Sequence, residues 1–188
     1  MDAPALELEC QTRCWSSMTL QSAAPDRGIY LRRPDLGRSL SPLSREHLET
    51  CPGPFDLALI IADGLSALAV HRHALELCSH LLNLLYRADW KCSPILLVQQ
   101  GRVAIGDEIG EILQAAMSLV LIGERPGLSA ADSLGAYLTW HPQLGRTDAE
   151  RNCVSNIRPT GLDYDAAAKR IFLLLTAART RQRTGYPY

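Results

Sequence analysis

The sequence predicts an α/β fold: a Rossmann-like, three-layer domain built on a mostly parallel sheet. Three short, continuous apolar runs support this prediction, at residues 57–62, 95–98 and 119–122. Uninterrupted apolar runs of this length are typical of strands that are buried on both faces. Helical patterns separate the runs, so residues 56–124 are expected to form two successive β-α-β units that share the middle strand.

The stretch between the first two strands has helical periodicity over about residues 66–88. Its apolar face comprises Val70, Ala74, Leu77, Leu81, Leu84 and Ala88. Its polar face comprises His73, Glu76, His80, Asn83 and Arg87. A shorter helix is expected from about residue 105, where Asp107 and Glu108 suit the positive end of the helix dipole. We therefore expect helices to cover the faces of the sheet.

The C-terminal part continues with shorter elements. Residues 136–140 are expected to form a fourth strand, and residues 163–183 a last helix that Gly185 can terminate. Two residue pairs have the spacing of a capping box: Ser129 with Asp132, and Thr147 with Glu150. Such pairs are typical of helix N-termini.

The N-terminal part lacks a comparable pattern. Residues 1–20 show no clean period, so we expect irregular structure there. Pro34 and Pro42 divide residues 30–49 into a turn and a short helix near residues 44–50. We divide the chain into an N-terminal segment, residues 1–52, and an α/β domain, residues 53–188.

Composition argues against several classes of protein. The formal net charge of −1 does not indicate binding to nucleic acid or to an anionic membrane. No apolar run approaches the roughly 20 residues that span a bilayer. Charged residues within residues 1–20 interrupt the apolar core that a secretory signal needs. The six cysteines form no C-x-x-C pair, which argues against a zinc ribbon. We expect a cytoplasmic protein.

Familiar catalytic patterns are missing. The sequence has neither a G-x-G-x-x-G nor a P-loop motif. Ser66 resembles the serine of a G-x-S-x-G elbow, but the final glycine is absent, and a place near a helix start explains this serine better. His73 and His80 share a helix face with Glu76 between them, yet a solvated polar stripe explains them more simply than a metal site. We assign no catalytic residue and no metal ligand.

A ligand site is expected at the strand ends. Loops 63–66, 100–103 and 123–127 follow the three buried strands, and each contains glycine, which lets the backbone approach a ligand closely. In open α/β sheets, ligands bind outside the carboxyl ends of the strands, where the strand order switches direction. The residues alone therefore predict a ligand-binding α/β domain.

Six segments occur in series along the chain: YLRRPDLGR (30–38), DGLS (63–66), GRV (101–103), DEIGEIL (107–113), GERPGL (123–128) and RNCVSNI (151–157). Together they closely resemble the light chain, or small subunit, of ethanolamine ammonia-lyase. The resemblance covers about residues 20–183. It rests on the common order of the segments, because each segment alone is short.

The resemblance implies an adenosylcobalamin-dependent lyase that converts ethanolamine to acetaldehyde and ammonia by a radical mechanism. The cofactor supplies the radical by homolysis of its cobalt–carbon bond, and the protein supplies position and electrostatics. The partner implied is a large subunit, whose barrel holds ethanolamine, in a hetero-oligomer. The small subunit helps to hold cobalamin between the chains. Some members of the family enter a bacterial microcompartment.

Carried over by position, the resemblance implies that Val103, Glu124 and Cys153 contact cobalamin. Each also has a simpler explanation: Val103 in packing, Glu124 in a turn paired with Arg125 or Arg102, and Cys153 as a buried thiol. No D-x-H-x-x-G motif is present. The resemblance likewise implies that cobalamin keeps its own lower base and that no histidine of this chain ligates cobalt.

One region departs from the expected pattern. Residues 1–19 do not match what should precede residue 20 in the family, where members have a longer region with a stretch like Leu-Gly-Arg-Ala-Gly. We therefore expect an N-terminally shortened member. The alternatives are a non-catalytic cobalamin-binding module and an inactive truncated copy. A lone α/β hydrolase is a weaker alternative, because the elbow motif is incomplete.

Overall fold

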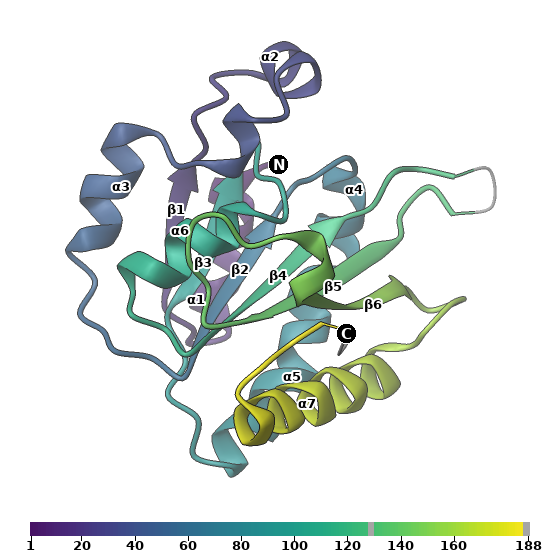
Figure 1. The fold of residues 1–188 in the computed structure, drawn as a ribbon. Helices are drawn as coiled ribbons and strands as arrows, with labels where there is room; N and C mark the ends of the chain where they lie inside the picture. Colours follow the sequence, from purple (N-terminus) through teal and green to yellow (C-terminus); the bar gives the residue numbers. More distant parts are fainter. Residues whose placement is uncertain (128–129, 186–188) are drawn as a thin grey trace.

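A computed structural model describes residues 1–127 and 130–185 and confirms the predicted α/β fold class (Figure 1). Its centre is a six-stranded sheet in the order β1-β3-β2-β4-β5-β6. The first four strands in this order run parallel: β1 (Ser17–Gln21), β3 (Ile95–Gln99), β2 (Leu57–Ala62) and β4 (Met117–Gly123). Two antiparallel strands extend the sheet, β5 (Leu134–Trp140) and β6 (Arg151–Ile157). The sheet is therefore mixed but mostly parallel.

Helices cover both faces of the sheet and make a three-layer structure (Figure 1). On one face lie α1 (Ala3–Thr12), α5 (Leu75–Arg87) and α7 (Tyr164–Arg181). On the other face lie α3 (Pro42–Glu49) and α6 (Ile105–Ile112). Every residue of β2 and β4 is buried, which explains why their sequences are continuous apolar runs.

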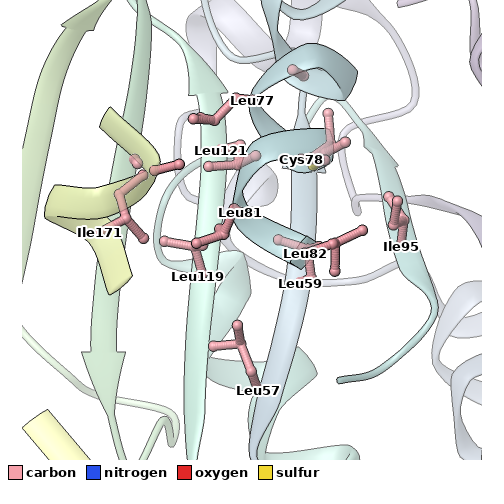
Figure 2. Close-up of a cluster of buried hydrophobic side chains, with 14 of the residues drawn as sticks. Leu57, Leu59, Leu77, Cys78, Leu81, Leu82, Ile95, Leu119, Leu121 and Ile171 are labelled. Atoms are coloured by element: carbon pink, nitrogen blue, oxygen red, sulfur yellow. The ribbon is translucent and has the colours of Figure 1, made fainter. Parts of the chain in front are cut away.

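Alternate residues of the central strands supply two separate cores. Leu59 of β2 and Leu119 of β4 pack toward Leu81 of α5 and Ile171 of α7 (Figure 2). Ile60, the neighbour of Leu59, belongs to the core beneath α6. This alternation follows from the two-residue period of a strand. Each strand is thus held from both sides, and the loops at the strand ends project from a rigid frame.

The helix predicted at residues 66–88 forms in three parts. A short α4 (Ala67–Ala69) leads into a π-helical turn (Val70–Ala74), and α5 follows. A π turn inserts an extra residue and shifts the helix faces that come before it relative to those after it. His73 is consequently buried, at 4% exposure, and not on a solvated face. The expectation of a single polar stripe is wrong at His73.

The expectation of irregular structure in residues 1–20 is wrong. Asp2 caps α1 by accepting a hydrogen bond from the Ala5 backbone nitrogen at 3.2 Å. The helix buries few residues, so its apolar residues show only a weak helical periodicity. Strand β1 is an edge strand in which only Leu20 is fully buried, and it pairs in parallel with β3. These N-terminal residues therefore belong to the same sheet as the later strands.

Between β1 and β2 the chain forms α2 (Arg27–Arg32), a 3-10 turn (Leu36–Arg38) and α3. The helix expected near residues 44–50 is α3. Its start at Pro42 follows Ser41, whose hydroxyl accepts a hydrogen bond from the Ser44 backbone nitrogen.

The C-terminal elements match the sequence in part. The capping box of Thr147 and Glu150 is present, and it begins a 3-10 turn (Asp148–Glu150). Ser129 lies outside the described residues, and residues 130–133 contain no helix. Helix α7 begins after Asp163, as expected, but ends at Arg181, and Gln182 has the left-handed conformation at its end. None of the helices in the described ranges is long and apolar enough to span a membrane.

Candidate functional site

The strand order switches direction between β2 and β4. The chain leaves β2 toward β3 on one side and leaves β4 toward β5 on the other. A hollow of about 450 Å³ lies at this point. Its lining residues are Tyr30, Gly64, Leu65, Arg102, Val103, Ile122, Gly123, Glu124, Arg125 and Tyr137. The ligand position expected from the loop sequences therefore coincides with a hollow in the structure.

Two glycines hold the loops after β2 and β4 against each other. Gly64 has a φ of +55°, and a Cβ added to it would lie 2.4 Å from Cγ1 of Ile122. A Cβ added to Gly123 would lie 2.0 Å from the Ser66 carbonyl oxygen. The Leu65 backbone nitrogen donates to the Gly123 carbonyl at 2.9 Å. Side chains at either glycine would separate the loops that form the hollow.

Tyr30 of α2 forms part of the wall. Two guanidinium groups lie over its buried ring, with Cζ of Arg102 at 4.1 Å and Cζ of Arg27 at 4.7 Å from the ring centroid. Nη1 of Arg27 donates to the Gly64 carbonyl at 2.6 Å, and the Tyr30 hydroxyl donates to the Gly101 carbonyl at 3.3 Å. Burial raises the pKa of Tyr30. Helix α2 is thereby fastened to the loops after β2 and β3.

Glu124 follows β4 and is only partly satisfied by the protein. Its Oε2 accepts hydrogen bonds from the Ser133 hydroxyl and from the Asn156 backbone nitrogen, the latter at 3.3 Å. Within residues 1–127 and 130–185, Glu124 makes no ion pair with Arg125 or Arg102, so the alternative of an arginine-paired turn is not observed. Its Oε1 has no donor among these residues and can accept from a ligand.

Val103 lies half-buried in the loop between β3 and α6 and lines the hollow. It also packs against the core beneath α6. The packing explanation for Val103 and a contact with a ligand are therefore compatible.

Cys153 lies on β6 directly opposite Tyr137 of β5. Tyr137 lines the hollow, whereas Cys153 is an exposed residue at its side and not a buried thiol. Although the residue as a whole is exposed, neighbouring groups partly shield its sulfur from water, and this shielding raises the pKa of Cys153. A hydrogen bond with Tyr137 lowers the pKa, and the Glu124 carboxylate raises it. Burial likewise raises the pKa of Tyr137. Both groups are neutral near pH 7, and Cys153 is not an activated nucleophile.

A second hollow, also about 450 Å³, adjoins the first and shares Arg102, Val103 and Tyr137 with it. Its other lining residues are Pro34, Arg38, Ala104, Arg146, Thr147, Asp148 and Arg151. Among the described residues, no histidine lines either hollow, and no group of His, Cys, Asp or Glu could hold a metal ion.

The model of the family described as ethanolamine ammonia-lyase light chain matches residues 1–187. The chain belongs to this family. It is 52% identical to ethanolamine ammonia-lyase small subunits of Pseudomonas fluorescens and Pseudomonas aeruginosa, across 98% of this chain and 69% of each relative. The small subunit of Pseudomonas putida is 51% identical over the same shares.

The matches correct one expectation. They extend to the first residues of the chain, so residues 1–19 are part of the similarity to the light-chain family. The formation of α1 and β1 from these residues agrees with that result.

A buried ion pair supports the second hollow. The Arg151 guanidinium on β6 donates to both carboxylate oxygens of Asp107 on α6, at 2.6 and 2.7 Å. It also donates to the Thr139 hydroxyl at 2.7 Å. The sequence assigned Asp107 only a helix-dipole role, because its partner lies 44 residues away. Glu108 is similarly occupied, since it pairs with Arg45 and accepts from the Leu40 backbone nitrogen.

Two further sequence candidates, Ser66 and His73, have structural roles. The Ser66 hydroxyl accepts from the Ala69 backbone nitrogen at 3.3 Å and donates to the Ala131 carbonyl at 3.1 Å. It therefore caps α4 and fastens the loop between β4 and β5. Nδ1 of His73 lies 2.8 Å from the Tyr164 hydroxyl, and its Nε2 lies 3.4 Å from Asp132. His73 thus connects the π turn to α7.

Proposed function

We propose that this chain acts as the small subunit of an adenosylcobalamin-dependent ethanolamine ammonia-lyase, which converts ethanolamine to acetaldehyde and ammonia. In this proposal, cobalamin lies between this chain and a large subunit and contacts Val103, Glu124 and Cys153. The single observation that carries the proposed site is the hollow at the β2–β4 switch, which Val103 and Glu124 line. Family membership supports the reaction.

The residues around the hollow fit the chemistry of a corrin. A corrin combines an apolar macrocycle with a fringe of amide side chains that donate hydrogen bonds. The free Oε1 of Glu124 can accept from such an amide, while Val103 offers an apolar contact beside it. Cys153 extends this surface along β6 as a neutral thiol. Because the two hollows share lining residues, they form one continuous site that is longer than either hollow alone.

When bound, adenosylcobalamin supplies a carbon-centred radical through homolysis of its cobalt–carbon bond. The residues of this chain position the corrin and shield it from water. The histidines lie away from the lining of both hollows, which supports a cofactor that keeps its own lower base. A protein imidazole-nitrogen signal on cobalt in electron paramagnetic resonance would contradict that part of the proposal.

The proposed partner is the large subunit, which supplies the ethanolamine site and the catalytic residues; we assign no catalytic residue to this chain. We further propose that the complex works in the cytoplasm, free or inside a bacterial microcompartment. Fractionation of cells that express both subunits tests this location.

The test of the proposed function is co-expression with the large subunit of a Pseudomonas relative, followed by an acetaldehyde assay with ethanolamine and adenosylcobalamin. Activity that requires both chains is the expected result. A complex that binds cobalamin but produces no acetaldehyde would favour a non-catalytic cobalamin-binding module. The matched control replaces this chain with the Pseudomonas small subunit, which shows that the large subunit is competent.

A further inference from the structure

The second hollow has an excess of positive charge. Four of its lining residues are arginines, and Asp148 is the one carboxylate among its described lining residues. Two of the arginines are neutralised within the protein. Arg151 pairs with Asp107 at 2.6 Å and with Asp148 at 3.4 Å, and Arg146 pairs with Glu150 at 2.5 Å. The positive charges of Arg38 and Arg102 are not neutralised by a carboxylate within the described residues.

Neither of these two arginines has a carboxylate partner among the described residues. Arg38 ends the 3-10 turn after α2, is exposed, and its guanidinium makes no hydrogen bond within those residues. The guanidinium of Arg102 donates to the Tyr30 carbonyl at 3.1 Å and stacks on the Tyr30 ring. Its Nε is shielded from water, and its Nη1 makes no hydrogen bond within the described residues. Arg102 therefore keeps donor capacity, which an acceptor that enters the hollow can use.

The position of this charge matters because Arg102 lines both hollows. A large ligand in the first hollow can therefore extend an arm into the second. Cobalamin has such an arm: a nucleotide loop that leaves the macrocycle and contains a phosphodiester, the fixed anion at the periphery of the cofactor. Arginine is the side chain best suited to phosphate, because its planar donors match two phosphate oxygens.

We propose that Arg38 and Arg102 bind the phosphodiester of the cofactor's nucleotide loop in the second hollow. This inference rests on the proposed function and adds to it the orientation of the cofactor. The macrocycle lies over Val103 and Glu124, and the nucleotide loop points toward the 3-10 turn of residues 36–38 and away from the Arg125 end of the first hollow.

The test compares adenosylcobalamin with adenosylcobinamide, which lacks the nucleotide loop and its phosphate. The affinity of each ligand for the complex with the large subunit is measured by titration of the visible absorption spectrum. Arg38→Ala is expected to weaken binding of adenosylcobalamin about 10-fold, the effect of losing one charge-assisted contact, and to leave binding of adenosylcobinamide unchanged. Arg38→Lys, which keeps the charge, should restore part of the loss.

Arg125→Ala is the matched control. Arg125 is also exposed, lines the first hollow and has no ion pair within the described residues. Its removal should affect the two ligands equally, which separates a direct phosphate contact from a general change in charge. A loss specific to adenosylcobalamin in Arg125→Ala, or equal effects of Arg38→Ala on both ligands, would overturn the inference alone. Failure of the unaltered complex to bind either ligand would overturn the proposed function and this inference with it.

Discussion

Two regions near the carboxyl ends of the parallel strands each hold a carboxylate, and they differ in how the protein uses it. Asp107, at the start of α6, is 2% exposed, and both of its oxygens accept from Arg151. Glu124, at the end of β4, is half-buried, and its Oε1 has no donor among the described residues. A carboxylate whose two oxygens both accept hydrogen bonds from the protein holds elements together, whereas one with a free oxygen is available to a ligand.

The largest expected effect is on the stability of the folded chain, and it follows from replacing the fully paired carboxylate of Asp107. Asp107→Ala leaves the guanidinium of Arg151 without its only buried carboxylate partner among the described residues, so the free energy of unfolding should fall by about 3–5 kcal/mol. Urea denaturation followed by circular dichroism measures this change.

Asp165→Ala is the control, because it removes an exposed ion pair with Lys169 on α7. Exposed pairs contribute little, so its effect should be much smaller. The double variant Asp107→Ala with Arg151→Met should recover part of the loss, because it removes the unpaired charge as well. Equal stabilities of Asp107→Ala and Asp165→Ala would show that the buried pair is not structural.

The second expected effect is a loss of affinity for cobalamin. Glu124→Ala should weaken cobalamin binding about 10-fold, the loss of one hydrogen bond to a charged acceptor, with little change in the free energy of unfolding. Spectroscopic titration of the complex measures the first quantity and urea denaturation the second.

Glu46→Ala, an exposed glutamate on α3, is the control for the removal of a negative charge. It should leave the affinity unchanged. Unchanged affinity in Glu124→Ala would remove Glu124 from the proposed site, and a large loss of stability would place it with Asp107.

A third effect concerns Cys153. Because its pKa is raised in the folded chain, its thiol should react with iodoacetamide more slowly in the folded protein than in the urea-unfolded protein at pH 8. Peptide mass spectrometry separates it from the other cysteines. Cys153→Ser should retain lyase activity in the complex, and abolished activity would point to a covalent role that the structure does not support.

The smallest effect is the pH dependence of the capping box. Contacts with the Thr147 backbone, Arg146 and the Thr147 hydroxyl lower the pKa of Glu150 from 4.5 to about 2. A lowered pKa means that the stabilisation is complete above about pH 4.5 and is lost as the pH falls toward 2. The difference in stability between the unaltered chain and Glu150→Gln should shrink over this interval. A difference that stays constant with pH would contradict this assignment.

The parts of the fold predicted from the sequence are those with strong local patterns. The strands β2, β3 and β4 are buried on both faces, so their apolar runs are continuous. Strand β6 was missed because its buried residues, Arg151, Val154 and Ile157, lie three apart. Arg151 faces α6 and Val154 the opposite core, and a register shift near Leu134 and Ala136 separates Val154 from Ile157 in that core. A strand without two-residue alternation has no clear sequence signal.

The candidate site likewise has parts that a local sequence pattern predicts and parts that depend on contacts between distant residues. The loops that carry Val103 and Glu124 could be predicted to meet, because consecutive parallel strands end at the same edge. The contact of Arg102 with the Tyr30 ring could not be predicted, since Tyr30 and Arg102 are 72 residues apart. The donors to Glu124 are Ser133, directly before β5, and Asn156 on β6, and no local pattern marks them. The cofactor contacts themselves remain predictions.

The most direct test of the account is an experimental structure of this chain with the large subunit and adenosylcobalamin. We predict that the corrin covers Val103 at the β2–β4 switch, with a corrin amide nitrogen about 3 Å from Oε1 of Glu124. A corrin bound elsewhere on this chain, or held by the large subunit without contact to Val103 and Glu124, would contradict it.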